Sequence, residues 1–207
     1  IYGEINTWDT SSVTDMSELF KNKSGFNEDI GEWNVSNVIN MNRMFSGAEQ
    51  FNQDISNWVV SAVTAMNGLF NGANNFNQNI GNWNVSMVSK MNGMFNDASN
   101  FDQDIRKWDV SQVTSMISMF NGASAFSQNL SGWDVNKISM APSNFSSNTN
   151  NMVDPVWNTT GSYKFSGKDE LVEAVNMYTG TDEDKEEAVE IYGEINTWDT
   201  SSVTDMS

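Results

Sequence analysis

The chain has 207 residues, a formal net charge of −17 and 38% hydrophobic residues, so it has enough apolar material for a packed core. The charge argues against nucleic acid and anionic lipid as partners, because both are bound mainly through Lys and Arg. The chain has no Cys and no His, which excludes disulfides, thiolate or imidazole catalysis and His-ligated metals. No apolar run reaches membrane-spanning length, and we expect no membrane insertion in this segment.

A 25-residue repeat runs through the first two thirds of the chain. Columns of Phe, Val, Met and Ile keep this step, and the Trp column consists of Trp8, Trp33, Trp58, Trp83, Trp108 and Trp133. One coil of this length cannot bury its own apolar residues, so neighbouring coils must stack. We therefore expect inward-pointing columns at Trp33, Val38, Met41, Phe45, Phe51 and Ile55.

Two local structures are indicated within each coil. Trp33 and Val35 alternate as in a short strand, whereas Val38, Met41 and Phe45 lie at helical spacing. Gly47 follows at a position that suits the end of a helix. The sequence thus predicts an α/β repeat solenoid whose coils each contain a strand, a short helix or 3₁₀ turn, and a return loop.

The pattern decays after Trp133, and the segment from 163 to 193 differs in composition. Residues 166–169 resemble a capped helix start, and a second start follows at Thr181 with acidic residues beside it. We expect three parts: a solenoid of about six coils over 1–162, a helical hairpin cap or linker over 163–193, and the start of an identical module over 194–207.

The last prediction depends on an identity between two distant segments. Residues 191–207 repeat residues 1–17 letter for letter, which gives a second period of 190 residues. Neighbouring copies of the chain are therefore expected to follow one another head to tail. The hairpin is expected to cover the open first coil of the module that follows it, because a solenoid end exposes apolar side chains and unpaired edges.

The motif from Trp33 to Phe45, continued by Phe51 to Ile55, resembles the repeats of BspA-like leucine-rich-repeat surface proteins. Such 25-residue repeats are common in mycoplasma lipoproteins and other microbial surface proteins, and the resemblance covers about residues 5–145. It implies a leucine-rich-repeat-like stack at the cell surface, with adhesive or interaction roles and no catalytic residues to transfer. Val59 departs from the motif, since the other coils carry Asp or Asn there.

Two columns could form binding sites, and each also has a structural interpretation. The Trp column could stack on sugars, although an aromatic ladder in the core is the stronger interpretation. Asp29, Asp54 and Asp104 could bind Ca²⁺, which prefers carboxylate oxygens, but such columns also satisfy backbone groups of loops. We therefore expect no cofactor, with these three aspartates as the only metal candidates.

No catalytic constellation is visible, because every candidate carboxylate recurs from coil to coil whereas an active site is singular. We expect a non-enzymatic, extracellular or cell-surface module with a structural or adhesive role in a longer tandem array or filament. The alternative is a protein- or glycan-recognition scaffold. Besides neighbouring copies of itself, other surface proteins or glycans are the partners that either hypothesis allows.

Overall fold

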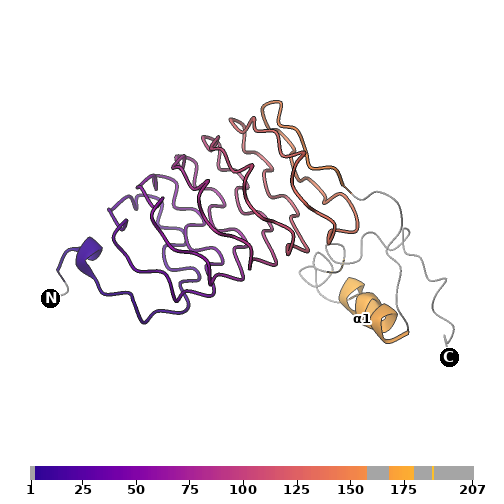
Figure 1. The fold of residues 1–207 in the computed structure, drawn as a ribbon, viewed down its shortest axis with the longest axis horizontal. Coiled ribbons are helices and arrows are strands. Elements are labelled where there is room, and N and C mark those ends of the chain that lie inside the picture. Colours follow the sequence, from indigo (N-terminus) through magenta and orange to yellow (C-terminus); the bar gives the residue numbers. More distant parts are fainter. Residues whose placement is uncertain (1–2, 158–167, 180–187, 189–207) are drawn as a thin grey trace.

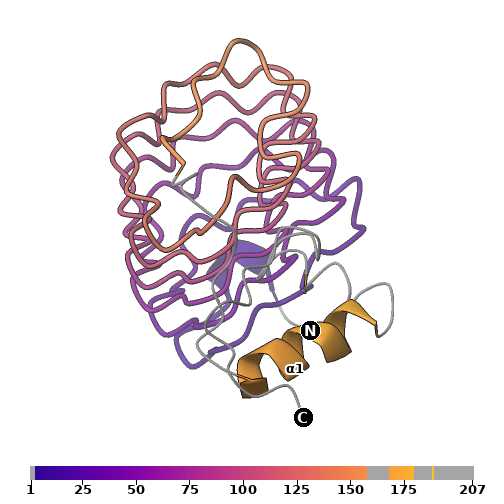
Figure 2. The ribbon, with the colours of Figure 1, turned by 90° about the vertical axis from the view of Figure 1, so that its right-hand side faces the viewer.

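The computed structural model describes residues 3–157, 168–179 and 188. Its two named elements are a 3₁₀ helix η1 over Ile5–Thr7 and an α-helix α1 over Lys168–Tyr178. Between them the chain winds into successive coils that stack along one axis, from the N-terminus at one end to Trp157 at the other (Figure 1). Viewed from the C-terminal end, the coils lie one behind another with a gradual offset, and α1 lies below them in this view (Figure 2).

The predicted α/β class is wrong, because no extended strand or sheet occurs in the described residues. Neighbouring coils pair through isolated parallel bridges, one residue per coil, in the series Asp15, Asn40, Ala65, Lys90 and Ser115. Local turns end the expected strand before it can lengthen: Trp33 donates its N–H to Ile30, and Val38 donates to Val35. The alternation of Trp33 and Val35 therefore reflects two inward side chains on a looped path.

The short helix or 3₁₀ turn expected in each coil does not form a helix, and only separate turns occur there. At Val38 to Phe45 the chain forms consecutive turns, with Met44 N–H bonded to Met41 O and Ser46 N–H bonded to Arg43 O. Arg43 has a φ of 55°, in the left-handed region that interrupts an α-helix. The N–H groups between these turns donate instead to the next coil, as Phe45 does to Leu69 O at 2.9 Å. Bonds between coils have replaced the bonds that would make a helix.

The expected inward columns are confirmed. All six columns are buried in the interior coils; Phe45, for example, is fully buried, and the Trp side chains from Trp33 to Trp133 are only 3–5% exposed. Phe rings of adjacent coils stack almost in parallel: the Phe45 and Phe70 centroids are 5.6 Å apart, and those of Phe70 and Phe95 are 5.7 Å apart. The core is thus a continuous set of aromatic and aliphatic ladders running the length of the stack.

The C-terminal part is described only in pieces. Helix α1 lies where the first helix of the hairpin was expected, and it buries Leu171 and Ala174 while Val172 and Val175 remain exposed. The second helix of the hairpin, apart from Ala188, and the identical copy of the first 17 residues lie outside the described residues. Within the described ranges, no helix is long and apolar enough to span a membrane.

Candidate functional site

The interior Trp column is structural. Each indole Nε1 donates to the carbonyl of the Ile in the preceding coil; Trp58, for example, bonds to Ile30 O at 3.2 Å and Trp83 to Ile55 O at 3.2 Å. Trp58 and Trp83 stack with centroids 6.5 Å apart and an interplanar angle of 4°. A sugar ring has no access to these faces. Trp8, in the first coil, differs from the others because its side chain is 43% exposed.

The calcium candidates are brought into one column, but each carboxylate serves its own coil. Asp29 Oδ1 accepts the N–H of Gly31, Asp54 Oδ1 that of Ser56, and Asp104 Oδ1 that of Arg106. Such bonds are Asx turns, which hold the chain in a tight bend. No cluster of three or more acidic residues that could hold a metal occurs in the described part of the chain.

The Asn columns satisfy backbone groups between coils. Asn52 Oδ1 accepts the N–H of Asn77, and Asn77 Oδ1 accepts the N–H of Asp102, at 2.9 and 3.0 Å. A second ladder, closer to the core, links Asn67 to the Asn92 N–H and Asn92 to the Ile117 N–H, both at 3.0 Å. Both amide columns therefore satisfy backbone groups between coils, the role that the sequence favoured for polar columns of this kind.

Local hydrogen bonds lower the pKa of several carboxyls on this surface. The Arg106 side chain and N–H lower the pKa of Asp104 far below its usual range, and Ser56 lowers that of Asp54 in the same way. A carboxyl whose pKa is lower in the folded state than in the unfolded state stabilises the fold while it is ionised. This stabilisation is fully present above about pH 4, and it is lost as the pH falls below that value. Asp54 and Asp104 therefore keep their carboxylates ionised at neutral pH.

Removing divalent cations is expected to leave the melting temperature unchanged. The reason is that the aspartates of the candidate column already bind backbone N–H groups, so no bound ion is needed to hold the coil. Thermal unfolding with and without a chelator, at matched ionic strength, measures this. A marked fall in melting temperature with chelator, reversed by added Ca²⁺, would show that a cation stabilises the fold.

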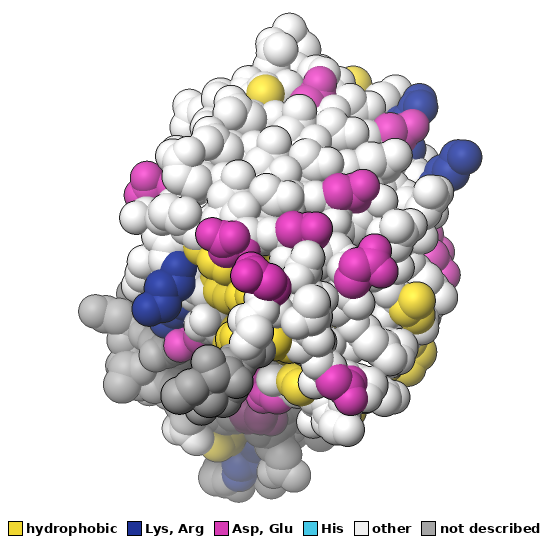
Figure 3. Space-filling model, turned by 90° about the vertical axis from the view of Figure 1, so that its left-hand side faces the viewer, with side chains coloured by type: hydrophobic (Ala, Val, Ile, Leu, Met, Phe, Trp, Pro, Cys, Tyr) yellow, Lys and Arg dark blue, Asp and Glu magenta, His cyan; other side chains and the backbone are white. Residues whose placement is uncertain are grey.

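The N-terminal end of the stack departs from the uniform pattern. Leu19 is 47% exposed there, whereas its counterparts Met44 and Leu69 in the next two coils are fully buried. Val13 and Phe26 are likewise only partly buried, and their counterparts are covered. Figure 3 shows a group of apolar side chains at this end, with Asp and Glu along its upper and right edges and Lys or Arg at its left edge. Each coil is covered by the one before it, and within the described residues nothing covers the first.

Sequence reasoning anticipated an open first coil but did not single out its residues. Leu19 belongs to a column of Met and Leu that is apolar in every coil up to Met119, so its letter carries no sign of exposure. The signal is positional: a column residue without a preceding coil loses half of its neighbours. The resulting surface is the candidate interaction site, and it includes Trp8 and Leu19.

Comparison with known proteins gives one family. The family model described as "Mycoplasma protein of unknown function, DUF285" matches residues 1–86, 55–158 and 175–207. No curated protein and no solved structure matches the chain. The matches together span most of the sequence, including both the stack and the segment that repeats its beginning. The chain therefore belongs to the DUF285 family of mycoplasma proteins.

Proposed function

We propose that the protein is a non-enzymatic structural or adhesive module of the cell surface, used head to tail in a longer tandem array or filament. The observation that carries this proposal is the uniformity of the stack. The polar columns of Asn27, Asp29 and Asn42, followed from coil to coil, hold backbone groups in place. A surface whose polar groups are used in this repeating way suits a load-bearing or spacing role.

The second support is the 190-residue recurrence. A recognition scaffold needs one array, whereas a chain that repeats the start of its first coil after a helical segment is organised as modules in series. The resemblance of its motif to the BspA-like surface proteins favours the same role. The acidic surface, which keeps modules soluble and apart at their sides, is compatible with contacts restricted to the ends.

The experiment has two parts on the native protein in its own cells. Labelling of intact cells with an antibody to the stack, with lysed cells as a control, tests whether the protein lies outside the membrane. Electron microscopy of the purified native protein then tests for elongated particles or filaments. Labelling only after lysis, or single compact particles, would contradict the proposal.

A further inference from the structure

The backbone of the stack has a direction. In the turn segment of the first coil, residues 15–22, every second N–H donates to a carbonyl of the second coil, at 2.7–3.0 Å; the donors are Met16, Glu18, Phe20 and Asn22. The second coil repeats the pattern toward the third, from Met41, Arg43, Phe45 and Gly47. The pattern continues along the stack, so N–H groups of this segment point toward the C-terminal end and carbonyls toward the N-terminal end.

The first coil therefore presents a row of outward carbonyls. The described residues contain no cis peptide bond, and the C=O and N–H of a trans peptide point in opposite directions. Since the donors face the second coil, the carbonyls one residue before them face away from it; they belong to Asp15, Ser17, Leu19 and Lys21. In the second coil the matching carbonyls accept from the first coil, but in the first coil no donor to them occurs among the described residues.

The last coil presents the complementary row. The carbonyls of Ser143, Phe145 and Ser147 accept from the preceding coil at 3.0, 2.8 and 2.8 Å. By the same geometry, the N–H groups of the residues that follow them point away from the stack; these residues are Asn144, Ser146 and Asn148. None of these three N–H groups has an acceptor among the described residues. Donors and acceptors at the two ends have the same two-residue spacing.

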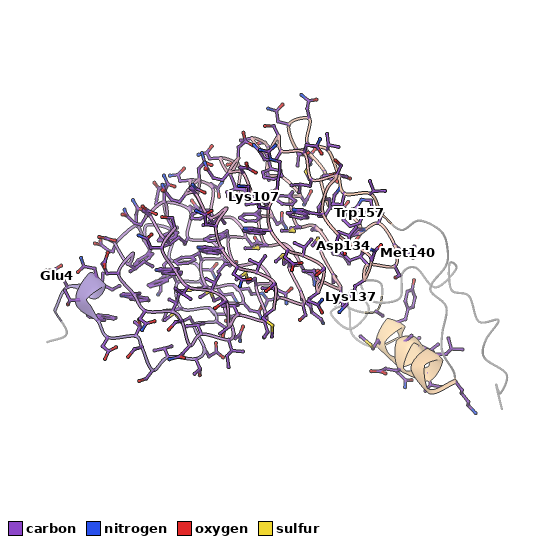
Figure 4. The ribbon with its side chains drawn as sticks, viewed as in Figure 1. Glu4, Lys107, Asp134, Lys137, Met140 and Trp157 are labelled. Carbon is purple, nitrogen blue, oxygen red and sulfur yellow. The ribbon has the colours of Figure 1, made fainter. Side chains whose placement is uncertain are left out.

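Apolar surface favours the same pairing, whereas charge does not select it. The first coil carries Glu4, Asp9, Asp15 and Glu18 with Lys21 and Lys23, and the last coil carries Lys137 with Asp134 and Asp154. Figure 4 shows Glu4 at one end of the stack and both Lys137 and Asp134 at the other. The exposed Leu19 in the carbonyl row would regain the cover that its counterparts receive from a preceding coil.

We propose that the first coil is a docking edge for the last coil of a second copy of this chain. The N–H row of residues 144–148 donates to the carbonyl row of residues 15–21, so that the ladder of one stack continues into the next. The contact is head to tail and does not close on itself, so it generates an open chain of copies. This inference rests on the proposed modular function. It assigns the cover of the first coil to the last coil of another copy, in place of the hairpin that the sequence led us to expect there.

The test is self-association of the full chain, measured by sedimentation equilibrium over a range of concentrations. The variant Leu19→Lys places a cation against the N–H row and Lys137 of the partner copy. The matched control is Ile39→Lys, because Ile39 is equally exposed, at 49%, on the side of the second coil. Both changes lower the net negative charge equally, from −17 to −16, so general repulsion between copies falls by the same amount in both.

The parent chain is expected to form a concentration-dependent series of species. Leu19→Lys should weaken the association about tenfold or more, and Ile39→Lys should change it less than about twofold, since only the first lies at the contact. A second measurement uses the absence of Cys: a mixture of Leu19→Cys and Ser146→Cys chains should form mixed disulfides faster than a mixture of Ile39→Cys and Ser146→Cys chains. Circular dichroism confirms that each variant is folded.

A chain that stays monomeric at all concentrations, or a closed dimer that Leu19→Lys leaves intact, would overturn the docking edge. Equal cross-linking from positions 19 and 39 would also overturn it. These outcomes concern the contact alone, and the cell-surface role could still hold. The opposite result is also possible: the chain associates through the docking edge, but the antibody labels it only in lysed cells. That result would support the contact and contradict the proposed function.

Discussion

Trp58→Ala is expected to lower the free energy of unfolding by roughly 3–5 kcal/mol, the range measured for large aromatic truncations in packed cores. The Trp58 side chain is only 4% exposed and stacks on Trp83. Its ring centroid lies 6.2 Å from that of Phe45. Its removal also leaves the carbonyl of Ile30 without the indole donor. Coils pack against Trp58 from both sides, so their side chains are held in place. They cannot move far enough to fill the cavity that the truncation leaves. Urea unfolding of the parent and the variant measures the loss.

The control is Trp8→Ala in the first coil. Trp8 stacks on Trp33 on one side at 6.3 Å and is 43% exposed, so its truncation should cost much less, about 1 kcal/mol, by the smaller area it buries. Equal losses at the two positions would show that the Trp column contributes through local structure and not through stacking between coils.

Asn92→Ala is expected to cost about 1–3 kcal/mol, the penalty for leaving buried hydrogen-bonding groups unsatisfied. Asn92 Oδ1 accepts both the N–H of Ile117 at 3.0 Å and the hydroxyl of Ser115 at 2.6 Å. The Ser115 side chain is nearly buried, at 3% exposure, so water replaces the lost acceptor poorly. Urea unfolding again gives the change in stability.

Two variants separate this ladder from the Asn content of the surface. Asn100→Ala removes an exposed amide whose side-chain bond, to Asn75 at 3.4 Å, is long, and it should change stability by less than about 0.5 kcal/mol. Asn92→Asp keeps an acceptor oxygen and should restore much of what Ala loses, as Asp102 already accepts the Ser127 N–H in the other ladder. Equal changes in the free energy of unfolding for all three variants would show that the Asn92 ladder contributes no more to stability than an exposed amide does.

The inward columns could be predicted from the sequence because burial follows from the repeat itself. A position that is apolar in every coil, such as Val38 or Phe51, must face its counterparts in the neighbouring coils, whatever path the backbone takes. The period of 25 residues therefore specified the core and the direction of stacking. It also indicated, through the column of Asp29, Asp54 and Asp104, that polar columns satisfy backbone groups of loops.

The path within a coil could not be predicted, because apolar spacing does not distinguish a helix from a series of turns. Val38, Met41 and Phe45 fit a helix by spacing, but that pattern takes no account of the N–H groups that the next coil can accept. The sequence also gives little sign of the residues with a left-handed backbone. Glu18, Arg43 and Ser118 have a positive φ at the same repeat position where other coils have glycine. The open carbonyl row has no signature in side chains at all, and only the structure shows it.

The hydrogen-bond ladder keeps one register from Met16 to Asn121, and this has a consequence for how such a protein can change length. Coils joined in this register make the same bonds to their neighbours, as the bonds from Phe20 N–H to Met44 O and from Phe45 N–H to Leu69 O, at 2.8 and 2.9 Å, illustrate. Duplication or loss of one 25-residue unit in the gene would therefore splice two compatible surfaces together. The stack would gain or lose one increment of reach, and both ends would remain the same.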